Sequence, residues 1–450
     1  MSKTSAPKMV SAAAPQSKQS PAQLGAWLLE QCREVGFDDA ALVRADTGTP
    51  DAERIVQLVD KGLQDALPFM QESAAMRADI KTRMPDAKSV LVVVQNYFSG
   101  HPEEAPSDEH LRISRYAWGK DYHQVMKRKL VKLRKRLMAY AQAFPADDDN
   151  EPVVSVFNDA SPVAERAWAI AAGLGDVGKS SMFIHRQLGT WVFLGGLVTN
   201  IDLQAPAMVD GTDRCGSCNA CIEKCPTGAI TAPFEVDAGL CLSTWTVERP
   251  LEDVADASLF VGHDWAVGCD VCQEVCPWNK FEVITAEQRF HPIDGHVWLA
   301  PNTPPQDLAG TPLARPGEEG LLRNAARATS GKTTSASCSL AECDDRAPFV
   351  AAFLRHARPI LTSWWRVCDE ALDELLLRFA EHDGFKPKGW RKRRDAQLSD
   401  EKLLEELVAE LQTLAKKQGM RRGKRPQALN KTTRARWVRT LLFDAGACKE

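Results

Sequence analysis

The order of apolar and polar positions along the chain predicts an α/β domain over residues 22–205. Within residues 22–45 we expect an amphipathic helix that ends at Gly36, followed by a short strand. Unbroken β-branched runs indicate buried strands, and runs with a period of 3.6 residues indicate helices. On this basis we expect strands at 89–94 and 153–157, and helices at about 51–66 and 122–144, the last of them rich in Lys and Arg.

Three further features belong to this domain. Ser161 is expected to cap a helix that starts at Pro162 and that Gly173 closes. The glycine-interrupted apolar run 189–199 predicts a bent strand or a hairpin. Residues 173–178 match G-x-G-x-x-G, but they follow a helix rather than a strand, so we do not interpret them as a nucleotide-binding loop.

The C-terminal part has a different composition. Residues 286–345 are expected to be an irregular linker, and residues 346–450 a mostly α-helical basic tail in which Ser399 caps a helix. From Gly384 to Glu450 there are 18 Lys or Arg against 8 Asp or Glu, in a chain whose net charge is −4. Contact with a polyanion and a solvated helical face both explain this surplus.

The chain shows no signal for export or membrane insertion. Residues 1–21 lack the apolar centre of a secretory signal and are expected to be a disordered leader. No run approaches the roughly 18 apolar residues of a membrane span. We therefore expect a cytoplasmic protein without membrane contact, in which disulfides are rare and the 13 cysteines need another role.

Eight of the cysteines form one array. Its first part has the spacing C-x2-C-x2-C-x3-C and consists of Cys215, Cys218, Cys221 and Cys225. Its second part has the spacing C-x2-C-x3-C and consists of Cys269, Cys272 and Cys276. Cys241 lies between the two parts, and a proline follows both Cys225 and Cys276.

The spacing predicts which cysteines act together. In bacterial two-cluster ferredoxins, the first three cysteines of such a run bind one cluster and the fourth binds the other. The same rule predicts one ligand set of Cys215, Cys218, Cys221 and Cys276, and a second set of Cys225, Cys241, Cys269 and Cys272. Structural zinc sites are the alternative, but they do not explain a three-cysteine run closed by Cys-Pro. We therefore expect two electron-transferring [4Fe-4S] clusters in a ferredoxin-like domain over residues 206–285.

Several stretches resemble the epoxyqueuosine reductases, which are cobalamin-dependent oxidoreductases of tRNA modification. They are 114–123 (SRYAWGKDYH), 159–167 (DASPVAERA), the glycines and lysine of 172–179, the cysteine array and 276–280 (CPWNK). The similarity covers about residues 22–328. The resemblance implies an α/β cobalamin-binding domain plus a two-cluster ferredoxin-like domain, with a mostly α-helical C-terminal tail, in which the clusters reduce the cobalt.

The resemblance also implies a reaction. Its substrate is the epoxide on the modified wobble base of certain tRNAs, and two electrons and two protons remove the epoxide oxygen as water to give queuosine. The carboxylate that matches Asp159 is the implied general acid, since a partly buried carboxyl with a raised pKa can supply the proton. Cofactor contacts are expected from Arg115, Tyr116, Lys179 and Ser243. The expected partners are tRNA and an electron donor such as flavodoxin or ferredoxin, and the protein is expected to be a monomer.

The chain departs from the family pattern at Glu72, Thr244 and Val271, where an arginine, a tyrosine and an aspartate are usual. It has no D-x-H-x-x-G stretch that would supply a histidine to cobalt. The residues after about 328 are either a divergent segment or the product of a shifted reading frame. Two other functions stay open: a related cobalamin-dependent reductase of a small molecule, of the reductive dehalogenase type, and an electron-transfer subunit of the ferredoxin type.

Overall fold

The structure is a computed structural model. It describes residues 15–45, 48–102, 104–107, 110–145, 150–248, 263–293, 295–300 and 308–333. Most of the expected leader, and the whole expected tail with the helix that Ser399 would cap, lie outside the described residues. Within the described ranges, no helix has the length and apolar character needed to cross a membrane.

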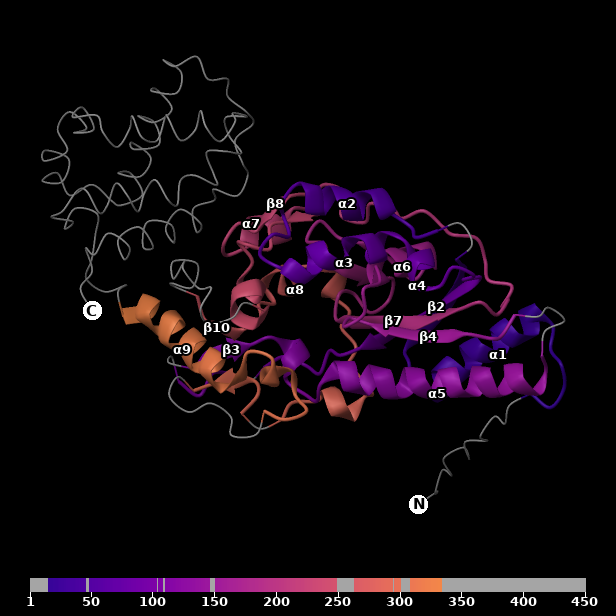
Figure 1. The fold of residues 1–450 in the computed structure, drawn as a ribbon. Coiled ribbons are helices and arrows are strands. Elements are labelled where there is room, and N and C mark those ends of the chain that lie inside the picture. Colours follow the sequence, from indigo (N-terminus) through magenta and orange to yellow (C-terminus); the bar gives the residue numbers. More distant parts are fainter. Residues whose placement is uncertain are drawn as a thin grey trace, which may run out of the picture.

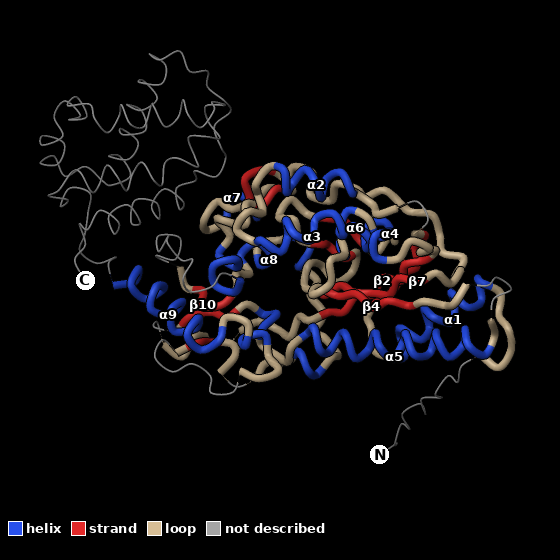
Figure 2. Tube along the Cα trace, in the orientation of Figure 1, coloured by secondary structure: helices blue, strands red, loops and turns tan. Residues whose placement is uncertain are grey.

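A four-stranded antiparallel sheet forms the centre of the α/β domain (Figures 1 and 2). Its strands, in spatial order, are β1 (Asp39–Arg44), β2 (Ser89–Asn96), β7 (Val192–Thr199) and β4 (Val154–Asn158). Every residue of β2 is buried. This explains why its sequence is an unbroken apolar run rather than an alternating one, because both faces of the sheet are covered.

Helices cover the two faces of this sheet (Figure 1). On one face, Leu91 and Val93 of β2 pack against the leucines of α1 (Pro21–Glu34) and α5 (Tyr122–Ala143). On the other face, Val90 and Val92 pack against α4 (Ile80–Arg83) and α6 (Glu165–Ala171). Helices α2 (Ala52–Asp60) and α3 (Pro68–Ala78) pack against each other and contribute no buried residue.

The cysteine array lies in a module of short elements. These are α7 (Ala220–Lys224), β8 (Ile230–Ala232), β9 (Glu235–Val236) and α8 (Val271–Glu274). A hairpin of β5 (Gly175–Val177) and β6 (Phe183–His185) connects α6 to β7. Helices α7 and α8 pack against each other, so the two parts of the cysteine array are neighbours.

A second, three-stranded sheet joins segments that are far apart in the sequence. It has the order β10 (Trp265–Val267), β3 (Leu111–Ile113) and β11 (Trp298–Leu299), and α9 (Gly317–Thr333) packs on it. The expectation of an irregular linker over 286–345 is therefore wrong for the described part of that range. Leu321, Ala325 and Ala328 of α9 are fully buried against this sheet, which stabilises a helix of modest apolar content.

Two other local predictions are wrong. The run 189–199 is not a hairpin, because β7 begins at Val192 and pairs with β2 as one continuous strand along its whole length. The helix expected from Pro162 begins only at Glu165, and Ser161 lies in a turn where its N–H donates to Asn158 O. The helices and strands predicted over 22–45 and 122–144 and at 89–94 and 153–157 are confirmed to within two residues at most ends.

Candidate active site

The eight cysteines of the array have free thiols, and their mutual electrostatic interactions place them in two groups. Burial raises the thiol pKa of Cys276, and the neighbouring thiols Cys215 and Cys218 raise it further. Burial, Cys215 and Cys276 together raise the thiol pKa of Cys221 to about 11. These interactions show that Cys215, Cys218, Cys221 and Cys276 are neighbours, and these four form the first ligand set that the spacing predicts.

The cysteines of the second predicted ligand set are also neighbours. Burial raises the thiol pKa of Cys272 well above its ordinary value, and Cys269, Cys241 and Cys225 add to the effect. Among the described side chains, no three Cys, His, Asp or Glu converge on a point suited to one metal ion. A four-iron cluster takes one thiolate at each iron and does not require such convergence. The two groups therefore have the composition that two [4Fe-4S] clusters need.

Short helical turns present these thiols. The N–H of Cys218 donates to Cys215 O at 2.9 Å, and that of Cys225 to Cys221 O at 3.0 Å. Cys225 caps the end of α7, and Pro277 opens a 3-10 turn directly after Cys276. The chain therefore turns sharply at the two cysteines that were predicted to reach the other cluster.

Lys179 lies against the first cysteine group. Its backbone N–H points at Cys215 Sγ at 3.4 Å, and its Nζ donates to Gly216 O at 2.6 Å and to Asn219 Oδ1 at 3.0 Å. Because the side chain is buried among these partners, Lys179 holds the segment that carries Cys215 and does not present an open cation.

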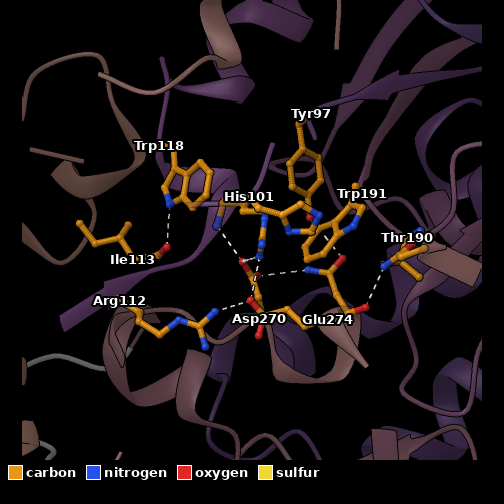
Figure 3. A network of polar contacts seen from close by, with 12 residues as sticks. Tyr97, His101, Arg112, Ile113, Trp118, Thr190, Trp191, Asp270 and Glu274 are labelled. Atoms are coloured by element: carbon orange, nitrogen blue, oxygen red, sulfur yellow. Dashed lines mark hydrogen bonds and ion pairs between the residues drawn. The ribbon is translucent and has the colours of Figure 1, made fainter. Parts of the chain in front are cut away.

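Arg115 lies against the second cysteine group. Its side chain is 3% exposed, and its Nη1 is 3.5 Å from Asp270 Oδ2 and 2.9 Å from Glu274 Oε1. The guanidinium also lies 4.8 Å from the ring centroid of Trp191, which is cation–π geometry. Figure 3 shows Asp270 and Glu274 facing Arg112, with Trp118 and Trp191 beside them. Asp270 follows the ligand candidate Cys269 directly, so Arg115 fixes the second cysteine segment to the chain after β3.

The other two predicted cofactor contacts are also engaged inside the protein. Burial raises the thiol pKa of Cys241, whereas hydrogen bonds from the backbone and side chain of Ser243 lower it. Tyr116 packs edge-on against Tyr122, with ring centroids 6.1 Å apart. Ser243 therefore touches a cluster-ligand candidate, and Tyr116 supports the ring of Tyr122.

Asp159 follows β4 and faces the start of α5. Its Oδ2 accepts a hydrogen bond from Tyr122 Oη at 2.5 Å and lies 3.4 Å from His123 Nε2. Its side chain is 61% exposed, so a substrate can reach the carboxylate. Asp121 caps α5 and accepts from the backbone N–H of His123, which orients the first turn of α5 toward Asp159.

The pKa of Asp159 is shifted in the direction opposite to the sequence-based expectation. Partial burial acts to raise it, but hydrogen bonds from His123 and Tyr122 outweigh burial and lower the pKa below its ordinary value. For His123, burial lowers the pKa, but the bonds to Asp159 and Asp121 raise it above its ordinary value. The pair therefore favours a carboxylate beside an imidazolium, and the expected raised pKa of Asp159 is wrong for this structure.

Glu165 is the neighbouring carboxyl that has a raised pKa. Burial and the charge of Asp159 raise the pKa of Glu165 to about 8, although Arg77 opposes the shift. Its Oε1 is buried and has no hydrogen-bond partner among the described residues. At neutral pH Glu165 is therefore protonated, which limits its repulsion of the Asp159 carboxylate.

A column of aromatic rings links the cysteine module to Asp159. Tyr97 stacks on Phe193 at 4.3 Å between ring centroids, and Phe193 stacks on Tyr122 at 4.2 Å. At one end the Tyr97 hydroxyl bonds to Gln273 Oε1 at 3.2 Å, between two ligand candidates. At the other end Tyr122 bonds to Asp159. The packed rings fix the acidic site relative to the second cysteine group.

Sequence reasoning missed Tyr122, His123 and Glu165 as site residues. The available signal was their position inside the two stretches 114–123 and 159–167. The structure brings these two stretches together at Asp159, which sequence spacing alone does not indicate.

Comparison with known proteins agrees with this geometry. One family model, described as "Epoxyqueuosine reductase QueG, DUF1730", matches residues 77–147. Another, described as "4Fe-4S double cluster binding domain", matches residues 214–279 and includes all eight cysteines of the array. The two matches cover α5 and the cysteine module.

Relatives and solved structures match over more of the chain. An epoxyqueuosine reductase of Synechocystis sp. is 40% identical over 247 residues, 55% of this chain and 81% of that protein. One of Cellulophaga algicola is 36% identical over 260 residues, 57% of this chain and 80% of that protein. A crystal structure of epoxyqueuosine reductase with an epoxyqueuosine-modified tRNA stem loop is 24% identical, with a TM-score of 0.59, and the match covers 80% of this chain and 99% of that one. At this identity, the crystal structure shows a shared fold.

Proposed function

Because the chain belongs to the epoxyqueuosine reductase family, we propose that it reduces epoxyqueuosine in tRNA to queuosine with electrons passed through two [4Fe-4S] clusters. The observation that carries this proposal is the placement of the Asp159 site beside two complete four-cysteine groups, joined by the packed rings of Tyr97, Phe193 and Tyr122. Family membership favours this function over reduction of a small molecule and over electron transfer alone.

The ligand assignment is part of the proposal. One cluster takes Cys215, Cys218, Cys221 and Cys276, and the other takes Cys225, Cys241, Cys269 and Cys272. Crossed ligation by Cys225 and Cys276 keeps the clusters close, which suits stepwise transfer of single electrons. Lys179 and Arg115 then act as supports of the two cysteine segments, from the contacts described above.

From the family resemblance we infer that cobalamin binds beside Asp159, along α3. Arg77 of α3 donates to Val163 O at 3.2 Å, so α3 lies beside the loop between Asp159 and Glu165. Phe69 and Met76 of α3 are 41% and 40% exposed, and Glu165 has an unpartnered buried oxygen. Exposed apolar side chains and a protonated carboxyl suit an apolar macrocycle with amide substituents, and these three residues would hold it. When bound, cobalamin would supply a reducible cobalt.

The residues around Asp159 would handle the protons. Loss of the epoxide oxygen as water consumes two electrons and two protons and leaves a carbon–carbon double bond. The imidazolium of His123 lies 3.4 Å from Asp159 Oδ2 and can deliver one proton through Asp159 to the oxygen of the opening epoxide. Solvent, which reaches the 61% exposed side chain of Asp159, supplies the second proton. Tyr122 holds Asp159 Oδ2 in place by its hydroxyl. A positioned acid of this kind contributes typically 10²–10⁴-fold in rate.

A genetic experiment tests the proposed function. In a bacterial strain that lacks its own epoxyqueuosine reductase, expression of this chain should convert epoxyqueuosine in tRNA to queuosine, as read from digested nucleosides by mass spectrometry. Expression of the Asp159→Asn variant should leave the epoxide in place. Persistence of the epoxide with the wild-type chain, expressed with its clusters, would contradict the proposal.

A further inference from the structure

Helix α5 carries an exposed row of cations. Lys127, Arg128, Lys132, Arg134 and Lys135 are all exposed, and among the described residues none of them takes part in an ion pair. At 100° per residue they occupy an arc of about 160°, opposite the buried leucines of the helix. No ion pair within the part of the chain that the structure describes accounts for these five cations.

Two other cations of α5 have structural roles, because they interact with other elements of the fold. Lys129 is buried, bonds to Gly36 O and Gln95 Oε1, and pairs with Glu287 at 2.8 Å. Arg136 pairs with Glu34 of α1 at 3.2 Å. Within the described ranges the exposed five have no such partner, so they are available to an anionic partner.

The row starts at the candidate active site. Tyr122 and His123, which contact Asp159, form the first turn of α5. With a rise of 1.5 Å per residue, Lys127 lies about 6 Å and Lys135 about 18 Å along the helix from His123. A polyanion that follows α5 would therefore extend away from a group bound at Asp159.

From this juxtaposition we propose that the exposed face of α5 binds the phosphate backbone of the RNA substrate while the modified base is held at Asp159. This inference rests on the proposed function and deepens it. An RNA strand carries one negative charge per nucleotide and gains affinity from each cation that neutralises a phosphate.

An acidic electron-donor protein is the other polyanion to consider. Such a donor must approach the clusters, which lie near α7 and α8. Figure 1 shows α5 running along the sheet away from these two helices, toward α1, with which Arg136 and Tyr140 interact. The direction of α5 therefore favours the substrate over the donor.

The test compares two double variants of the full chain, loaded with its clusters. Lys132→Gln with Lys135→Gln removes two cations from α5, and Lys224→Gln with Lys280→Gln removes two exposed cations beside the cysteine groups. Lys and Gln have similar helix propensities. Binding of an epoxyqueuosine-containing tRNA anticodon hairpin is measured by fluorescence anisotropy at several salt concentrations, without reductant.

The slope of log affinity against log salt is negative, and for the α5 variant we expect its magnitude to decrease by about 1.4–1.8. The affinity of this variant at 0.15 M salt should be about 20-fold lower than that of wild type. The control variant should keep the wild-type slope. Equal slopes for the α5 variant and wild type, or equal losses in both variants, would overturn the inference. A loss confined to binding of an acidic flavodoxin would assign α5 to the donor instead and also overturn it. Conversion of the hairpin by wild-type protein, measured in parallel, tests the proposed function separately.

Discussion

Glu165 gives the sharpest test of the electrostatics around Asp159. The folded protein holds this carboxyl protonated, with a pKa of about 8, against an ordinary value of 4.5. Replacement by glutamine keeps the size of the side chain and removes the titration. The Glu165→Gln variant therefore isolates the pH-dependent part of the free energy of unfolding that comes from this buried acid.

The sign and magnitude follow from linkage. The raised pKa makes the contribution of Glu165 to stability fully present below pH 4.5 and lost as the pH rises through 8. Each pH unit in this window changes the free energy of unfolding by about 1.4 kcal/mol. At pH 7 the wild type has therefore lost about 3 kcal/mol that the glutamine variant keeps. The hydrogen bonding of the amide adds an offset, but that offset does not depend on pH.

Thermal or urea unfolding of the cluster-loaded proteins under anaerobic conditions, at pH values from 5 to 9, measures this difference. The stability of Glu165→Gln relative to wild type should rise by about 1.4 kcal/mol per pH unit and level off above pH 8. Glu53→Gln, at an exposed position on α2, controls for the chemical replacement itself. A difference between Glu165→Gln and wild type that stays constant across this pH range would refute the reasoning.

Three further predictions concern the site and the clusters. Asp159→Asn should lower kcat/KM for an epoxyqueuosine-containing hairpin by about 10²–10⁴-fold without changing the iron content, and a smaller effect than tenfold would speak against its role as proton donor. The raised pKa of His123 predicts that kcat/KM falls as the pH rises through that pKa. The His123→Gln variant should lack this descending limb of the pH profile. If the limb persists in the variant, His123 is not the group that titrates. The Cys276→Ser variant should bind fewer than the roughly eight iron atoms per chain that two clusters contain. The control Cys32→Ala, at a buried thiol outside the array, should keep the full iron content. Full iron loading of Cys276→Ser would contradict crossed ligation.

The sequence predicted elements whose pattern is set locally. The buried run of β2 and the capped, periodic helix α5 lie where expected, because strand and helix periodicities are visible over eight residues or more. β7 was misread because Gly195 and Gly196 interrupt its apolar run. In the structure a Cβ at Gly196 would collide with Leu91 O and the ring of Phe157, so glycine is what allows this strand to pair closely with its neighbours.

Contacts between distant segments could not be predicted from pattern. Arg115 was expected to contact a cofactor or phosphate, but its partner Asp270 lies 155 positions away along the chain. β3 has only three residues and becomes a strand through its neighbours β10 and β11. Pairing with distant strands determines the conformation of short elements whose own sequence does not determine it.

The sequence predicted the place of Asp159 in the fold but not the direction of its pKa shift. Asp159 does lie at the end of a strand beside a helix, as the sequence indicated. The direction of its pKa shift depends on Tyr122 and His123, which enter from α5. The raised pKa expected of Asp159 belongs to Glu165 instead, and only the packing of α6 against this loop reveals it.

The proposed function is removal of the epoxide oxygen with two crossed clusters and the Asp159 site. Its most direct test is anaerobic incubation of the cluster-loaded protein with cobalamin, a low-potential reductant and an epoxyqueuosine-containing tRNA hairpin, followed by mass spectrometry of the nucleosides. We expect a product lighter by one oxygen atom, formed by wild type and lost in Cys276→Ser and in Asp159→Asn. Unchanged epoxyqueuosine with the fully loaded wild-type protein, or undiminished conversion by either variant, would contradict it.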